Sequence, residues 1–404
     1  MNASVAAPPD RLPLTLRRKL AILTILTLVA SMAIGGVLEG GARLAGMRPG
    51  RRRVFDAERG WIYVPNTVFQ YLATQGRVHV SVNGEGFRPT LAGADNPAAP
   101  AIVCVGDSYT FCGESPDDGT WPEHMSRELA RKGFACRAVN LGITGYSSMQ
   151  SLVALRHELR RSGGASPVGG VLYLFCLNDP LENFVADRPH LSRDEVGGPP
   201  GPSGSLDPKE YPPDDPPARS LRIFLRDLRA PSAFLNGIKS ERPEDTPAAY
   251  AAGAATFAEL YGPRCREFLD TPVFQEGIRH VLRKLRKECA SKGAPLFVST
   301  CIAPAWDTPG AARQEFCAML NWSAERMETQ VADYHAALDR VRQLSAEEGA
   351  TFIDIRGCLE GMKFREYAAA SNDWHFSKAA NERIGKAVAD RLFPRLAGPK
   401  GAPR

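Results

Sequence analysis

The chain has 404 residues, of which 44% are hydrophobic and 24% are charged. It can therefore bury the core of one large domain with attachments, or of two modest domains. Its net charge of +5 is uneven, because residues 1–53 hold nine Lys and Arg against two acidic residues, a local charge of +7, which leaves about −2 for the remainder. This distribution excludes a basic face for nucleic acid on the main part of the chain.

The first predicted element is a membrane span. Leu20–Leu38 is a 19-residue run without a charge, and as a helix it is long enough to cross about 30 Å of hydrocarbon. Arg17–Lys19 precede it, which suits a signal peptide or an uncleaved signal anchor. Because no small-x-small cleavage site closes the run, we favour the anchor, with residues 1–19 as a cytoplasmic tail. Basic residues at 43–53 compete with this orientation under the positive-inside rule.

Residues 39–100 are predicted to form a juxtamembrane linker and a small β segment. In "RVHVSVNGEGFR", Val78, Val80 and Val82 alternate with His79 and Ser81, and an Asn-Gly turn follows. This is the pattern of a strand with one buried face. His79 lies on the polar phase, so we expect it to face solvent.

Residues 101–397 are predicted to form the main domain, in which short apolar runs alternate with longer helical ones. The predicted strands are Ala101–Val105, Arg137–Leu141, Gly170–Leu177, Pro295–Cys301 and Thr351–Ile355. The predicted helices are Trp121–Lys132, Ser148–Arg161, Val273–Ser291, Arg326–Glu348 and Lys378–Leu396. Such alternation predicts an α/β fold, a three-layer α/β/α sandwich around a parallel five-stranded sheet.

A Pro-rich insertion at about 181–260 interrupts this rhythm. Eight prolines fall between Pro199 and Pro217, a composition typical of loops or disorder. An amphipathic stretch follows, with Leu221, Phe224 and Leu225 on one side. The insertion is either a lid over the substrate or a passive surface excursion, and its composition leaves both open.

Cysteines and motifs point to no metal and no cofactor. Of nine cysteines, Cys104, Cys176 and Cys301 lie in strand-like runs and are expected to be buried thiols. The other six form no C-x-x-C, and the odd count leaves at least one free thiol. The chain also lacks a His pair spaced as in a zinc helix, a Walker loop and a dinucleotide-binding glycine loop.

Polar residues follow three successive predicted strands. Gly106-Asp107-Ser108 follows the first strand, Asn140–Gly145 the second and Cys176–Pro180 the third. Open α/β folds bind ligands at this carboxyl edge of the sheet. Ser108 is therefore a candidate nucleophile, although Ser in such a place is also common in turns and as a helix cap.

A histidine follows the last predicted strand. The run "SNDWHFSKAANERIG" places Asp373 and His375 just before the closing helix. A serine nucleophile needs a base of this kind, oriented by a further group.

These four segments resemble the SGNH hydrolase family, also called GDSL-like esterases, whose four blocks contribute Ser, Gly, Asn and His in that order. The resemblance covers Ala101 to Leu396 apart from the insertion, and it implies a flavodoxin-like sheet. The segments "GWIYVPN" and "VNGEGFR", with the amino-terminal span, look like the membrane-anchored bacterial branch of that family.

The resemblance implies a role for each matching residue. Ser108 matches the nucleophile and His375 the general base. The oxyanion hole would comprise the Ser108 and Gly145 N–H groups and the Asn178 side chain.

Two positions depart from the family pattern. Block three usually reads G-x-N-D, but Cys176 stands in place of the glycine, and we expect the turn to form despite it. The acid usually stands three residues before the histidine, where this chain has Asn372. Asp373, two residues before, is therefore the candidate acid. Otherwise Asp373 caps the closing helix, and a backbone carbonyl orients His375 in a Ser-His dyad.

The resemblance implies a serine esterase without metal or cofactor. Its expected substrate is a short-chain acyl or acetyl ester, and one form of this expectation places the acyl group on a carbohydrate. It would be a single-pass protein of the bacterial inner membrane, held by Leu20–Leu38, with an extracytoplasmic catalytic domain and no nucleic-acid partner. Two alternatives stay open: an O-acyltransferase acting on extracytoplasmic polysaccharide, and an inactive protein that binds an ester or a glycan.

Overall fold

The structure is a computed structural model, and its described residues divide into two compact units. One unit contains helix α1 (Leu14–Leu44), and the other contains every described residue from Arg53 onward. The described ranges are 14–44, 53–56, 58–73, 76–161, 167–179, 247–307, 310–370 and 373–397.

Helix α1 contains the predicted span. Its stretch Arg18–Leu38 has a mean hydropathy of 2.3, and none of it is buried in the protein. These 21 residues extend about 31 Å as a helix, which matches the hydrocarbon thickness of a bilayer. The hydroxyls of Thr24 and Thr27 donate to the carbonyls four residues earlier, so the helix satisfies its own polar groups. The apolar helix is confirmed, and both a membrane anchor and a signal sequence have this form.

A five-stranded parallel sheet forms the centre of the second unit, as predicted. Its strand order is β6-β5-β7-β8-β9. The strands β5, β7 and β8 are buried along all or most of their length, as expected where helices cover both faces of a sheet. Their bounds are β5 Ala101–Val105, β6 Arg137–Asn140, β7 Val168–Phe175, β8 Leu296–Thr300 and β9 Thr351–Phe352.

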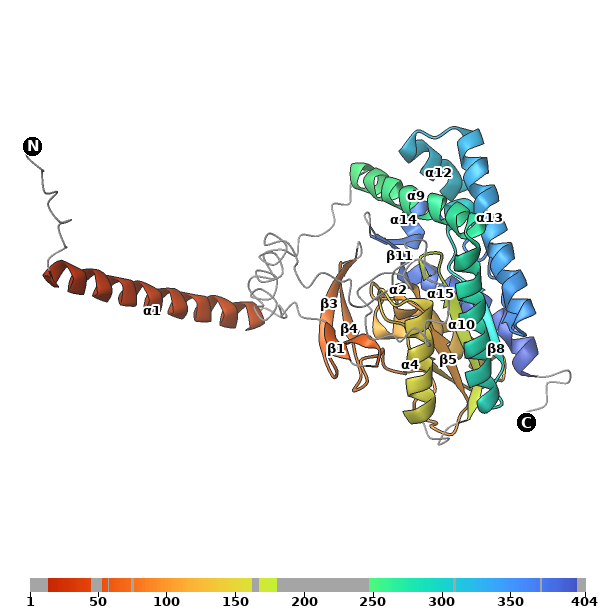
Figure 1. Cartoon of the computed structure of the whole chain (residues 1–404), viewed down its shortest axis with the longest axis horizontal. Helices are drawn as coiled ribbons and strands as arrows, with labels where there is room; N and C mark the ends of the chain where they lie inside the picture. Colours follow the sequence, from red (N-terminus) through yellow and green to blue (C-terminus); the bar gives the residue numbers. More distant parts are fainter. Residues whose placement is uncertain are drawn as a thin grey trace, which may run out of the picture. The chain divides into compact units, whose positions relative to one another are not determined.

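Helices cover the sheet in two layers (Figure 1). On one face α3 packs against α15, and on the other α4, α10 and α13 lie next to one another. Right-handed crossovers produce this division, because the chain reverses its direction along the sheet after β6. The reversal makes the carboxyl end of β5 the topological switch point, where such folds bind ligands. The bounds are α3 Trp121–Arg131, α4 Ser148–Arg161, α10 Pro272–Ser291, α13 Ala324–Glu347 and α15 Lys378–Leu396.

Several elements were not predicted from the sequence. Helix α9 (Pro247–Asp270) begins within the predicted insertion and buries Cys265 and Phe268 against its neighbours. Strands β10 (Ala368–Ala370) and β11 (Asp373–Phe376) form an antiparallel hairpin where the sequence suggested a loop. The amphipathic stretch at 221–228 lies outside the described residues. Further helices that were not predicted are α2 Ser108–Phe111, α11 Pro304–Asp307, α12 Ala311–Leu320, α14 Phe364–Tyr367 and a 3-10 turn at Asp117–Gly119.

The predicted β segment comprises two hairpins. Strands β1 (Arg53–Asp56) and β2 (Gly60–Tyr63) pair with each other, as do β3 (Val68–Ala73) and β4 (Gly76–Ser81). In β4, Val80 is fully buried and His79 is exposed. The alternation predicted from the sequence is therefore confirmed.

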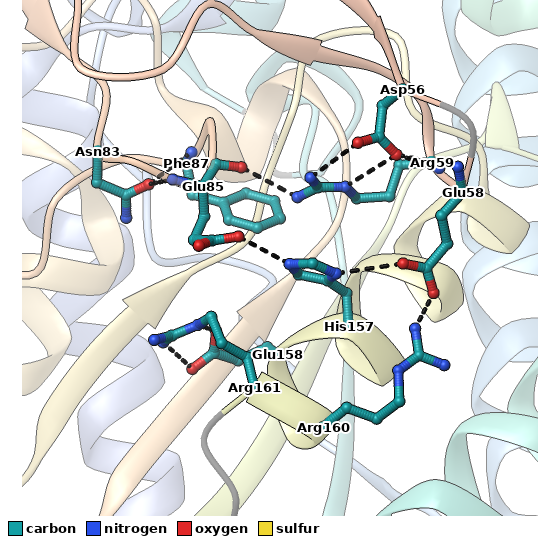
Figure 2. A network of polar contacts seen from close by, with 10 residues as sticks. All are labelled: Asp56, Glu58, Arg59, Asn83, Glu85, Phe87, His157, Glu158, Arg160 and Arg161. Carbon is teal, nitrogen blue, oxygen red and sulfur yellow. Dashed lines mark hydrogen bonds and ion pairs between the residues drawn. The ribbon is translucent and has the colours of Figure 1, made fainter.

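A polar network fastens this β segment to helix α4 (Figure 2). The ring of His157 lies between two carboxylates, with Nε2 2.8 Å from Glu85 Oε2 and Nδ1 3.2 Å from Glu58 Oε2. Arg59 donates to the backbone carbonyl of Glu85 at 3.0 Å and pairs with Asp56 at 3.1 Å. These contacts hold the β segment in place beside the main domain.

Candidate active site

A sharp turn from β5 into α2 presents Ser108. Gly106 has φ +156°, and a Cβ there would lie 2.3 Å from Thr110 Oγ1 and 3.0 Å from the Leu174 carbonyl, so only glycine fits. Ser108 is partly exposed, whereas the next three residues of α2 are buried. The N-cap of this helix is Asp107, which accepts from the Tyr109 N–H at 2.9 Å. The interpretation of Ser108 as a helix cap is therefore wrong.

Asp107 connects α2 to the end of β7. Its carboxylate also accepts from Cys176 Sγ at 3.3 Å and from Asn178 Nδ2 at 3.4 Å. Burial raises the pKa of Asp107, while its hydrogen bonds and the nearby His375 oppose that rise. No role for Asp107 was expected from the sequence, although Asp is one of the preferred residues at a helix N-cap.

The turn after β7 forms with cysteine in the glycine position, as expected. Asp179 Oδ2 accepts from the Tyr173 hydroxyl at 2.6 Å and from the Cys176 N–H at 3.2 Å. The Asp179 N–H closes the turn on the Cys176 carbonyl at 3.0 Å. Cys176 also supplies the hydrogen bond to Asp107, which a glycine has no side chain to make. The substitution thus adds a contact and leaves the turn intact.

The turn after β6 lies directly against α2. Asn140 Nδ2 donates to the Thr110 carbonyl at 2.7 Å, and Asn140 Oδ1 accepts from the Gly142 N–H at 2.9 Å. A Cβ on Gly142 would lie 2.4 Å from the Phe111 nitrogen, so this close approach also requires glycine. Gly145 follows in the same turn, with φ +80°.

The β segment supports this turn from outside. The Tyr63 hydroxyl donates to Thr144 Oγ1 at 2.8 Å, next to Gly145. The Tyr63 ring stacks on Phe111 of α2, with ring centroids 4.5 Å apart. One buried tyrosine therefore contacts both the helix that begins with Ser108 and the turn that contains Gly145.

His375 reaches α2 from the opposite end of the chain. Its ring packs on Tyr109, with centroids 4.9 Å apart and planes inclined by 47°. Because Tyr109 adjoins Ser108, this contact brings the imidazole to the start of α2. The His375 side chain keeps 22% of its surface exposed.

Glu114 is a carboxylate beside His375 that the sequence analysis missed. Its Oε1 lies 3.5 Å from His375 Nδ1, and its side chain is only 6% exposed. It lies in the turn after α2, and nothing in the sequence distinguishes it from other acidic residues in turns. The tertiary fold places a buried acid beside Nδ1, which is the ring nitrogen that donates to the acid in a catalytic triad.

The structure describes Asp373 only in part. Its backbone pairs with Ala370 across the β10–β11 hairpin, and its side chain lies outside the described residues. Ser377 is the N-cap of α15 and accepts from the Ala380 N–H, so the interpretation of Asp373 as that cap is wrong. Its role as the acid stays a prediction.

No family model matches the chain, and no curated protein matches it. Several solved structures share its fold loosely. A lipase/acylhydrolase from Enterococcus faecalis is 15% identical over 75% of this chain and 100% of that one, with a TM-score of 0.35. A protein described as lipolytic and of the G-D-S-L family, from Desulfitobacterium hafniense, is 10% identical over 72% and 99%, with a TM-score of 0.35.

An acetyl-xylooligosaccharide esterase from Geobacillus is also similar. It is 13% identical over 76% of this chain and 100% of that one, with a TM-score of 0.35. The Desulfitobacterium protein is the one described as belonging to the G-D-S-L family, which the four sequence blocks resemble.

Proposed function

We propose that this protein is a membrane-anchored serine esterase of the SGNH type. Its substrate is a short-chain acyl ester, acetyl foremost, carried by a carbohydrate. The observation that supports this best is the meeting of three segments at the carboxyl edge of the sheet. Asp107 links Asn178 to the start of α2, and Tyr109 places His375 beside it. Ser108 lies between these two contacts in the chain.

His375 acts as the base in this mechanism. The imidazole takes the Ser108 proton as Oγ attacks the ester carbonyl, and the resulting imidazolium later protonates the leaving alcohol. A carboxylate at the other ring nitrogen stabilises the imidazolium and holds the ring. Glu114 is the described carboxylate that faces Nδ1, at 3.5 Å, and Asp373 is the acid suggested by the family pattern.

Three N–H groups stabilise the oxyanion. The Ser108 N–H opens α2, where the first amides of a helix have no intrahelical acceptor. The Asn178 amide carries two hydrogens, and it uses one on Asp107, so the second is available for the substrate. Gly145 contributes its N–H from the turn beside α2. Losing one such donor typically costs about 10²- to 10³-fold in rate.

Ester cleavage by the full chain in detergent tests the proposal. We expect 4-nitrophenyl acetate to be hydrolysed, and both Ser108→Ala and His375→Ala to reduce turnover by at least about 10³-fold. Unchanged turnover by Ser108→Ala would refute Ser108 as the nucleophile, and the proposed function with it.

The fate of the acyl group separates hydrolysis from transfer. An esterase releases acetate into water at the rate at which it releases nitrophenol. A burst of nitrophenol followed by acetylation of an added glycan would identify a transferase that uses the same acyl-serine. If a folded protein shows neither a burst nor turnover, the remaining interpretation is an inactive protein that binds an ester or a glycan.

A further inference from the structure

A pocket of about 360 Å³ adjoins the proposed catalytic site and shares Glu114 with it. Four segments line it: β4 with Arg77 and His79, the turn after α2 with Glu114, β10 with Ala369, and the start of α15 with Lys378. Glu114 connects the pocket to the site, because the same carboxyl group faces His375 Nδ1. A group bound in this pocket would therefore lie on the Nδ1 side of His375, whereas the proposed mechanism directs the other ring nitrogen at Ser108.

Positive charge dominates the lining. Arg77 donates to the Gln70 side chain at 3.2 Å, and within the described part of the chain neither Arg77 nor Lys378 has a carboxylate at ion-pair distance. Elsewhere on the surface, by contrast, arginines such as Arg283 and Arg356 pair with acidic residues at 2.8 Å or less. Unpaired cations that converge on a concavity attract anions.

The acidic groups in and beside the pocket do not cancel this charge. Glu114 is buried and directed at His375. Asp117, in the adjacent turn, pairs with the buried Arg88 at 3.3 Å and accepts from the Ser81 N–H at 3.0 Å. The amino-terminal end of α15, a helix of 19 residues, adds its partial positive charge beside Lys378.

We propose that this pocket binds an anionic group of the sugar chain that carries the ester, so that the enzyme prefers acidic polysaccharides. This inference rests on the proposed esterase function. The acyl group must reach Ser108, so a pocket on the Nδ1 side of His375 receives the alcohol part of the substrate. Its volume lies in the range of small-ligand sites, and a carboxylate or sulfate on a neighbouring sugar offers oxygens that Arg and Lys bind well.

Matched oligosaccharides test the preference with the full chain in detergent. The substrates are O-acetylated oligogalacturonate, which carries carboxylates, and O-acetylated xylo-oligosaccharide of the same length, which carries none. We expect kcat/KM for the acidic substrate to exceed that for the neutral one, and the ratio to fall as salt is raised. Arg77→Gln and Lys378→Gln should each reduce the ratio about 10-fold, chiefly through KM.

Lys292→Gln is the matched control, because Lys292 is an exposed lysine at the end of α10, in a different pocket. It should leave the ratio unchanged. A wild-type ratio near one, or a ratio that survives both pocket substitutions, would overturn the inference.

Direct binding distinguishes failure of this inference from failure of the proposed function. Calorimetry with unacetylated oligogalacturonate measures the affinity of the pocket for an acidic chain without any catalysis. Binding that Lys378→Gln weakens, in a protein that cleaves no ester, would refute the esterase and support the pocket. Ser108-dependent cleavage with no preference for acidic chains would support the esterase and refute the anion-binding pocket.

Discussion

Replacing Glu114 with glutamine should slow catalysis strongly. The substitution keeps the shape of the side chain and removes its negative charge beside His375. At the observed 3.5 Å separation, a carboxylate and an imidazolium attract each other by about 5 kcal/mol at an effective dielectric constant of 20. Because a glutamine oxygen retains part of that interaction, we expect a loss near 3 kcal/mol, or about 10²-fold in kcat.

The assay is the pH dependence of 4-nitrophenyl acetate hydrolysis. Loss of a carboxylate makes His375 easier to deprotonate, so the acid limb of kcat/KM should move to lower pH while KM changes little. A purely structural role for Glu114 would not move this limb. Glu382→Gln, at an exposed glutamate on α15, serves as the control and should change neither kcat nor the limb.

Asp373→Asn provides the opposing test. If Asp373→Asn lowers kcat by 10² or more while Glu114→Gln stays within twofold of the wild type, the acid is Asp373 and Glu114 only packs beside the histidine. A large loss in both variants would indicate two carboxylates acting on one imidazole.

Two further predictions concern stability. Cys176→Gly restores the usual residue of the family motif, yet we expect it to lower the free energy of unfolding by about 1–2 kcal/mol. The substitution removes the hydrogen bond to Asp107 and leaves a buried gap. Denaturant unfolding measures this loss, and an unchanged midpoint would contradict the prediction. Burial raises the pKa of Asp307 from 3.8 to about 6, so the folded state binds its proton more tightly and stability should fall as pH rises from about 4 to 6. Asp307→Asn should remove that fall and raise the free energy of unfolding by up to about 3 kcal/mol at pH 7.5, with little change at pH 4. Thermal unfolding measures both proteins across this pH range, and the same pH dependence in the wild type and the variant would contradict the prediction.

Local patterns determined most of the framework. The apolar run at Ala101–Val105 and the helical periods of Ser148–Arg161 and Lys378–Leu396 predicted elements with the bounds that the structure has. The alternation of strands and helices predicted the parallel sheet, because short-range hydrophobic period and crossover rules restrict the fold. Strand ends also indicated Ser108 and Asn178, since the carboxyl edge of such a sheet is where ligands bind, whereas His375 was indicated by its place before the closing helix and by the family resemblance.

Only the tertiary structure decided what surrounds those residues. Glu114 meets His375, Tyr63 meets Thr144, and Arg77 and Lys378 line one pocket, although each set comes from distant parts of the chain. None of these pairs has a sequence spacing that marks it, because the contacts form when hairpins and helix ends pack around the sheet. The candidate nucleophile Ser108 could be proposed from where a strand ends, whereas Glu114 beside His375 and the cationic pocket depend on how the surrounding segments pack.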